Sequence, residues 1–108
     1  MTRYRIAATN EVPPGYAKVV DAGDLSLAVC NVEGEFFVID DHCTHDNGPL
    51  GEGQLYGDQI ECPRHGARFN VRTGKVTRMP AVRPVKTYPI TVEDGAIFVD
   101  IVDIDDEW

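Results

Sequence analysis

The sequence predicts an all-β protein, an antiparallel sandwich or barrel of short strands. Glycine and proline interrupt the chain so often that the longest stretches free of both, 35–47 and 96–108, hold only thirteen residues each. Long helices therefore have no room. Short segments rich in β-branched and aromatic residues recur between these interruptions and favour extended structure. With 108 residues, the chain is long enough to bury a core, and we expect a single domain over 1–108.

The first strand is expected at 4–8, and the proline- and glycine-containing segment 10–15 ends it. Because successive side chains of a strand point to opposite faces, Tyr4, Ile6 and Ala8 share one face and Arg3 and Arg5 the other. Turn dipeptides at 33–34, 57–58 and 94–95 predict hairpins. The remaining strands are expected at 18–20, 25–32, 35–40, 54–56, 59–61, 76–78, 86–93 and 96–102.

Two short motifs at the centre of the chain predict a metal site. Cys43-Thr44-His45 is followed, after sixteen residues, by Cys62-Pro63-Arg64-His65-Gly66. Each motif offers one thiolate and one imidazole at the end of a predicted hairpin. Sulfur and nitrogen ligands of this kind select zinc or an iron-sulfur cluster and exclude calcium and magnesium.

The pattern Cys-x-His, sixteen residues, Cys-x-x-His, together with Pro63 and Gly66, resembles the ligand motifs of Rieske 2Fe-2S proteins. The resemblance implies one 2Fe-2S cluster in a Rieske-type sandwich with a cluster-binding subdomain at about 41–81. It assigns Cys43 and Cys62 to one iron and His45 and His65 to the other. Met79-Pro80-Ala81 resembles the proline loop that covers the cluster in this family.

Two other interpretations of the four residues remain. A structural zinc site would use the same ligand types, although zinc fingers usually place a Cys-x-x-Cys pair before their histidines. Four unconnected residues in a plain β domain would require the spacing to be accidental.

The residues after the second motif bear on the reduction potential. In Rieske centres two neutral imidazoles replace two thiolates, which removes standing negative charge and raises the reduction potential. The potentials of these centres span about −150 to +300 mV. High-potential members carry a Ser and a Tyr that donate hydrogen bonds to the cluster sulfurs, and an extra disulfide between the loops. Here Gly66-Ala67-Arg68-Phe69 offers no hydroxyl, and no cysteine is available for the disulfide. We therefore expect a low potential that changes little with pH near neutrality.

The resemblance implies a one-electron carrier between a flavoprotein reductase and a terminal oxygenase, as in bacterial ring-hydroxylating dioxygenase systems. We expect an electron-transfer protein and no enzyme, since His42 is the only other histidine and cannot build a mononuclear iron site. A Rieske-like small subunit of a larger reductase, such as assimilatory nitrite reductase, or a non-redox zinc module are the alternatives.

The composition narrows the partners and the compartment. The formal net charge of −8 argues against nucleic acid and anionic membranes, and favours proteins with basic docking patches. No leader-like or membrane-spanning apolar run is present, so we expect a cytoplasmic protein. We also expect a monomer. Cys30 lies outside both motifs and is expected to be a small buried apolar residue. Arg64 and Arg68 would stabilise a reduced cluster or pair with surface carboxylates, and His42 is expected in an exposed loop.

Glycines between the two motifs, in 46–53, have a predicted function as well. Glycine lets the backbone approach a ligand closely, and backbone amides of this segment could donate hydrogen bonds to the bridging sulfides.

Overall fold

The computed structural model describes residues 2–42, 50–63, 66–79, 81 and 83–101. Within these ranges the chain forms eleven strands, two short 3-10 helices and no α-helix, and no helix there is long and apolar enough to cross a membrane. The predicted all-β fold is therefore confirmed. The helices are η1 (Thr9–Glu11) and η2 (Leu50–Glu52).

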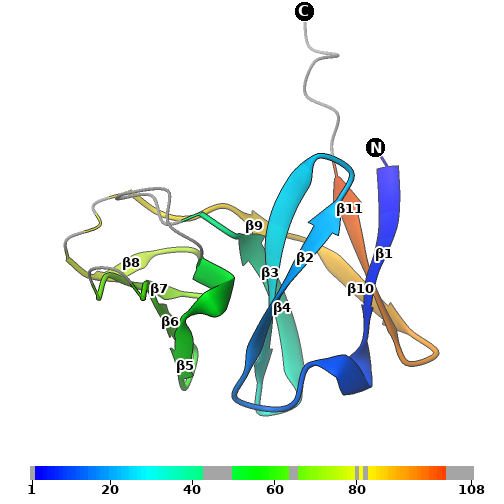
Figure 1. Ribbon diagram of the computed structural model, residues 1–108, viewed down its shortest axis with the longest axis horizontal. Coiled ribbons are helices and arrows are strands. Elements are labelled where there is room, and N and C mark those ends of the chain that lie inside the picture. The colour runs from blue at the N-terminus through cyan, green and yellow to red at the C-terminus, as the bar shows by residue number, and fades with distance from the viewer. Residues whose placement is uncertain (1, 43–49, 64–65, 80, 82, 102–108) are drawn as a thin grey trace, which may run out of the picture.

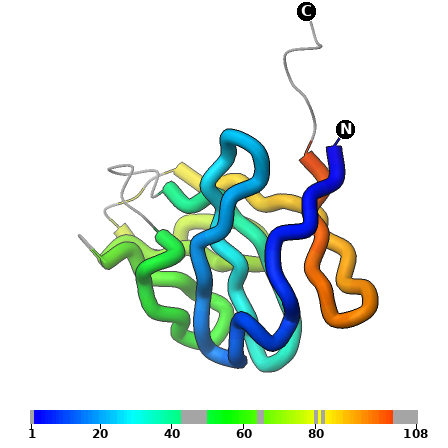
Figure 2. The backbone as a smooth tube through the Cα atoms, turned by 45° about the vertical axis from the view of Figure 1, so that its right-hand side comes forward, coloured from blue at the N-terminus to red at the C-terminus, as the bar shows by residue number. Residues whose placement is uncertain are grey.

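The strands make three antiparallel sheets that lie side by side (Figures 1 and 2). The first is ordered β1 (Thr2–Ala8), β11 (Ala96–Ile101), β10 (Ile90–Glu93). The second is ordered β2 (Ala17–Ala22), β3 (Leu25–Val32), β4 (Glu35–Asp40), β9 (Thr87–Tyr88). The third is ordered β5 (Gln54–Tyr56), β6 (Gln59–Glu61), β7 (Arg68–Asn70), β8 (Val76–Arg78).

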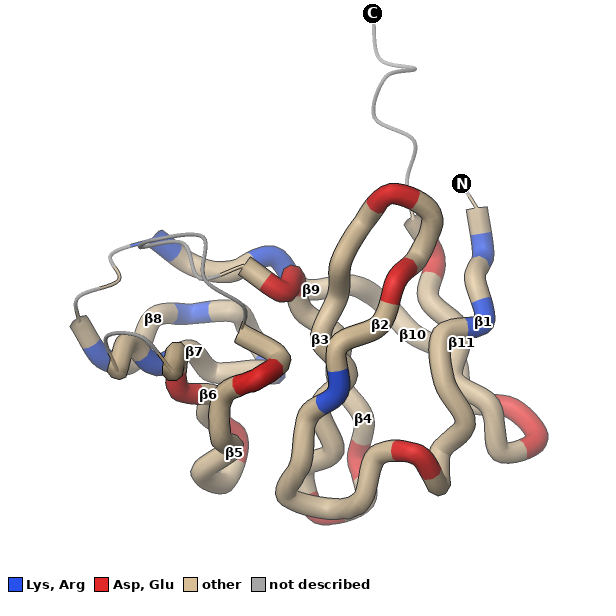
Figure 3. The backbone as a smooth tube through the Cα atoms, in the orientation of Figure 1, with Lys and Arg blue, Asp and Glu red and all other residues tan. Residues whose placement is uncertain are grey.

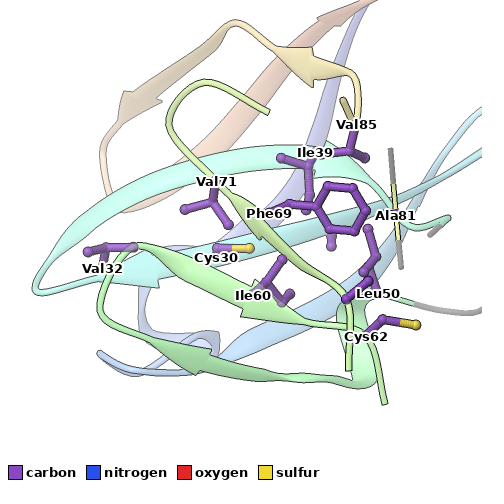
Figure 4. Close-up of a cluster of buried hydrophobic side chains, with 12 residues drawn as sticks. Cys30, Val32, Ile39, Leu50, Ile60, Cys62, Phe69, Val71, Ala81 and Val85 are labelled. Carbon is purple, nitrogen blue, oxygen red and sulfur yellow. The ribbon is translucent and has the colours of Figure 1, made fainter. Parts of the chain in front are cut away.

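Strand β3 is buried on both faces and separates two apolar clusters. Leu27 and Val29 face the first sheet, and they form a core with Ile97 and Val99 of that sheet and with Val38 of β4. The alternate residues of β3 face the third sheet, in a second core shown in Figure 4 that contains Ala28, Cys30, Val32, Ile60, Phe69 and Val71. This explains the apolar run at 27–30 of the strand, since a strand covered on both sides shows no alternation. The second core carries the segment of the two motifs.

Most predicted strands are confirmed within two residues, but two details were wrong. A register shift between Arg5 and Ala7 interrupts the pairing of β1 with β11. At this bulge Ala7 turns into the core and is 1% exposed, so Ala7, and not Ala8 as predicted, packs in the cluster that Tyr4 and Ile6 contact.

The predicted strand at 86–93 is two strands that belong to different sheets. Strand β9 pairs with β4, whereas β10 pairs with β11. Pro89 lies between them, and proline cannot donate the hydrogen bond that a continuous ladder requires. The chain therefore changes sheets at this residue and ties the sandwich together.

Candidate metal centre

Cys62 is the one residue of the four predicted ligands that lies within the described ranges. It directly follows β6, its side chain is 1% exposed, and it packs in the second core with Leu50 and Ala81. In Figure 4 its sulfur lies at the edge of this cluster and points away from Phe69. Cys43, His45 and His65 lie outside the described residues.

The backbone around Cys62 closes a tight turn between β6 and β7. The amide of Cys62 donates to the carbonyl of Ala67 at 2.7 Å, and the amide of Gly66 donates to the carbonyl of Cys62 at 3.0 Å. Gly66 has φ +77°, a left-handed conformation that glycine adopts without strain. The second motif is thus held at both ends by hydrogen bonds and by the β6–β7 pairing of Glu61 with Arg68.

The first motif is bracketed by a buried carboxylate. Asp41, 6% exposed, accepts a hydrogen bond of 2.6 Å from the amide of Gly51 and one of 3.1 Å from the hydroxyl of Ser26. Its own amide donates to the Ser26 carbonyl at 3.0 Å. Asp41 therefore joins the end of β4 to β3 and to η2, across the segment that contains Cys43 and His45. Sequence reasoning missed this role, whose one signal was a carboxylate placed directly after an apolar strand.

The close approach predicted for the glycines occurs, but at Gly51 and Gly53 the protein itself makes it. A Cβ on Gly51 would lie 2.5 Å from Cγ2 of Val19, and one on Gly53 would lie 1.9 Å from the carbonyl oxygen of Glu61. Their amides donate to Asp41 and to the Leu50 carbonyl. The prediction that these two amides donate hydrogen bonds to cluster sulfides is therefore wrong for both. Gly48 lies outside the described residues. The close packing places the end of the first loop beside the strand that leads to Cys62.

Charged residues next to the second motif pair with one another. Oε2 of Glu61 lies 3.5 Å from Nε of Arg68 and 3.6 Å from Nη1 of Arg78. The Arg68 guanidinium also stacks on Tyr56, 4.3 Å from the ring centroid. Arg68 thus forms the surface ion pair that the sequence suggested, while Arg64 lies outside the described residues.

His42, which directly precedes the first motif, is exposed as predicted. In the predicted proline loop, Met79 is 77% exposed and Ala81 is buried against the second core, while Pro80 lies outside the described residues. Burial raises the pKa of the Cys30 thiol to about 12, so Cys30 stays protonated and is the buried apolar residue that we predicted.

The donor chemistry at Cys62 fits a soft metal centre. A buried thiol at the rim of an apolar cluster can bind iron or zinc as a thiolate, and the surrounding Leu50, Ile60 and Ala81 exclude water. Residues 2–89 match the Rieske [2Fe-2S] domain family. The chain belongs to this family.

Similar proteins share the fold over nearly their whole length. The chain is 45% identical over 101 residues to a biphenyl dioxygenase ferredoxin subunit of Pseudomonas sp. strain KKS102, with 93% of both chains covered. It is 40% identical to the solved Sphingomonas yanoikuyae B1 ferredoxin, with a TM-score of 0.89, covering 94% of this chain and 100% of the other. A ferredoxin solved in complex with the reduced oxygenase of carbazole 1,9a-dioxygenase is 37% identical, with a TM-score of 0.85 and coverage of 90% and 91%.

These comparisons confirm three predictions made from the two motifs. The fold is that of a Rieske-type ferredoxin, the cofactor of the family is one 2Fe-2S cluster, and the role is electron transfer and not catalysis.

Proposed function

We propose that this Rieske ferredoxin accepts single electrons from a flavoprotein reductase and delivers them to the terminal oxygenase of a ring-hydroxylating dioxygenase system. The observation that carries this proposal is the likeness to a ferredoxin solved together with the oxygenase that it serves. The biphenyl dioxygenase relative, at 45% identity, supports the same assignment. The likeness to this ferredoxin subunit favours a diffusing carrier over a small subunit of a larger reductase. We further propose that the chain is a single domain over 1–108, acting as a cytoplasmic monomer.

The proposed cluster ligands are Cys43 and Cys62 on one iron and His45 and His65 on the other. The burial and orientation of Cys62 support its part in this set. The cluster-binding subdomain would span about 41–81, and the third sheet lies within that span. When bound, the cluster supplies a one-electron couple, and the protein supplies two thiolates, two imidazoles and a dry apolar wall.

The residues beside Cys62 favour a low potential. Hydrogen bonds to cluster or ligand sulfur raise the potential because they stabilise the added negative charge. Ala67 and Phe69, which follow the second motif, are both fully buried and carry no hydroxyl. The potential therefore lies toward the lower end of the Rieske range and is nearly constant around neutral pH.

The first experiment is anaerobic purification followed by iron and sulfide analysis, visible and EPR spectra, and potential measurements from about pH 6 to about pH 9. We expect a Rieske spectrum and a low potential with little pH dependence. A colourless zinc protein would refute the electron-transfer role, and a high potential that falls steeply with pH would refute the argument from the missing hydroxyls.

A pair of cysteine variants tests the ligand assignment. Cys62→Ser should lose iron and sulfide, whereas Cys30→Ala, which changes another fully buried cysteine of the same core, should retain both. The partners are tested by turnover of a biphenyl dioxygenase reductase and oxygenase that depends on added ferredoxin. If both variants lose the cluster, the loss reflects damage to the apolar core and not the removal of a ligand.

A further inference from the structure

The basic residues of this acidic protein are concentrated in one part of the chain. Seven of the ten Lys and Arg residues lie between 62 and 92, and none of the eighteen Asp and Glu residues does. In Figure 3 the basic segments of the described chain gather on the third sheet and on the connection to β9. The remaining sheets carry most of the acidic segments. Net charge alone therefore misrepresents the surface near Cys62.

Four of these cations form one connected region, which we call the basic side: Arg68, Lys75, Arg78 and Lys86. Arg68 pairs with Arg78 across β7 and β8. The turn that holds Lys75 lies beside the segment that holds Lys86, because the amide of Val85 donates to the carbonyl of Gly74 at 2.8 Å. Lys75, Arg78 and Lys86 are exposed, and Arg68 is half-buried.

Internal ion pairs leave most of this positive charge uncompensated. Glu61 alone serves both Arg68 and Arg78. Among the described residues, no carboxylate lies within ion-pair distance of Lys75 or Lys86, although Lys86 stacks on Tyr88, 5.0 Å from the ring centroid. Four cations against one carboxylate give a surplus of three positive charges. Arg72 differs, since it pairs with Glu35 and Asp58 and faces the ring of Phe37.

The basic side adjoins strand β6, which leads directly to Cys62. Arg68 and Glu61 are partners in the β6–β7 ladder, and Glu61 directly precedes Cys62. Met79, next to Arg78, is 77% exposed and is the most exposed large apolar side chain of the described chain. An exposed apolar side chain directly after a basic residue adds apolar contact to charged contact, and protein docking patches combine the two.

We propose that the basic side, together with the exposed Met79 beside Arg78, docks an acidic protein surface on the electron-transfer partner. The inference rests on the proposed function and reverses the partner charge that the net charge of the chain suggested. Attraction between the basic side and carboxylates of the partner steers the encounter, while the acidic remainder of the molecule repels other orientations. The surplus of charge thus selects the orientation in which the metal-binding end meets the partner.

A protein partner suits this surface better than a nucleic acid or an anionic membrane. Binding to phosphate backbones or lipid headgroups needs several cations free of nearby carboxylates. Here Glu61 lies among the cations, and the net charge of the whole chain is −8. Carboxylates arranged to match a mixed surface can avoid Glu61, whereas a uniform phosphate surface cannot.

The test compares two double variants of the cluster-loaded protein that remove the same charge. Lys75→Gln with Lys86→Gln changes the basic side without touching a residue beside Cys62. Arg5→Gln with Lys18→Gln changes exposed cations on β1 and β2, which are not part of the basic side. The reduced proteins are oxidised by hexacyanoferrate(III) or by hexaammineruthenium(III). One electron passes from the protein to the trivalent metal complex, which becomes divalent.

We expect the anionic oxidant to react more slowly as salt is added and the cationic oxidant to react faster. The basic-side variant should react with the anion at least about threefold more slowly than wild type at low salt, and the control should match wild type. Equal effects of the two double variants, or a faster reaction of the cation at low salt, would overturn the proposal. A protein without a Rieske spectrum would instead contradict the proposed function.

In the reconstituted dioxygenase assay, the basic-side variant should raise the KM for ferredoxin about threefold with kcat unchanged. An unchanged or lower KM would show that the partner surface is not acidic. Wild type that reduces hexacyanoferrate(III) but gives no turnover would contradict the proposed partners while leaving the charge measurement valid. Binding of a 20-base-pair DNA duplex that weakens in the basic-side variant would overturn the choice of a protein partner.

Discussion

The carboxylate of Asp41 accepts a hydrogen bond of 2.6 Å from the backbone amide of Gly51. This contact joins two points of the chain that flank Cys43 and His45. The same carboxylate accepts a hydrogen bond from the hydroxyl of Ser26 on β3. This pair of hydrogen bonds, which we call the bracket, is thus anchored to the central strand of the fold. A buried carboxylate that receives two hydrogen bonds holds its position strongly, because losing either would leave a polar atom unsatisfied.

Asp41→Ala should therefore weaken retention of the cluster. Without the carboxylate, the Gly51 amide and the Ser26 hydroxyl lose their acceptor, at a cost of about 1–3 kcal/mol. We expect faster loss of iron and broader EPR lines than in wild type. Asp41→Asn keeps one carbonyl oxygen as acceptor and should restore much of the wild-type retention.

Asp40→Asn is the matched control, because Asp40 accepts a hydrogen bond from the Tyr88 hydroxyl at 2.5 Å on β9. It should lower stability without changing the EPR spectrum. If Asp40→Asn and Asp41→Ala lose iron equally fast, the hydrogen bonds of Asp41 have no specific role in retaining the cluster.

Gly53→Ala should destabilise the third sheet. Its Cβ would lie 1.9 Å from the carbonyl oxygen of Glu61, so β5 and β6 must separate, at a cost of about 1–3 kcal/mol. Gly57→Ala, with φ +63° and nothing within 4 Å of the new Cβ, should cost only about 1 kcal/mol through its backbone conformation. Urea unfolding distinguishes the two, and an equal loss would show that the sheet adjusts freely at Gly53.

Cys30 makes stability depend on pH in the alkaline range. Burial raises the pKa of its thiol from 9.0 to about 12, so the unfolded chain loses this proton first. The contribution of the protonated Cys30 thiol to the unfolding free energy is fully present below about pH 9 and is lost as the pH rises toward about 12. Relative to Cys30→Ala, wild type should lose about 1 kcal/mol of unfolding free energy between about pH 8 and about pH 10. If the unfolding free energies of wild type and Cys30→Ala, measured in urea, change with pH in the same way, this prediction is wrong.

Asn31 offers a test of the sandwich alone. Its amide nitrogen donates to the Val12 carbonyl at 2.7 Å, and its side-chain oxygen accepts from the Gly34 amide at 2.7 Å. Asn31→Ala leaves both groups without a partner and should lower the unfolding free energy by about 1–3 kcal/mol. The EPR spectrum should not change, since these bonds join β3 to the segments of Val12 and Gly34, which carry none of the proposed ligands.

Periodicity and turn residues predicted most of the fold. The strands Leu25–Val32, Glu35–Asp40, Gln54–Tyr56 and Gln59–Glu61 were predicted at their observed bounds. The bulge at Ala7 could not be predicted, because it depends on the pairing of β1 with β11. The break at Pro89 could have been, since proline inside a predicted strand interrupts its ladder.

For the site, residue types and spacing predict the ligand set, which stays a prediction, whereas the contacts that support Cys62 and the first motif came only from the tertiary structure. The role of Asp41 depends on η2 lying against β3, and the glycines at 51 and 53 are required by neighbouring side chains and carbonyls that are distant in sequence. Charge showed the same limit, because the total for the chain gave the opposite sign from the surface beside Cys62.

The pairing of β4 with β9 has a consequence for how such a protein can be rebuilt. Ile39 pairs with Thr87, and the amide of Asp40 donates to the carbonyl of Lys86 at 3.0 Å. The chain thus leaves the sandwich and returns to it at adjacent points, so the segment between them resembles an insertion cassette. Exchanging 41–86 for the equivalent segment of a relative changes the redox end and its charge while leaving both junctions in place, provided that the side chains facing Ala28, Cys30 and Val32 are matched.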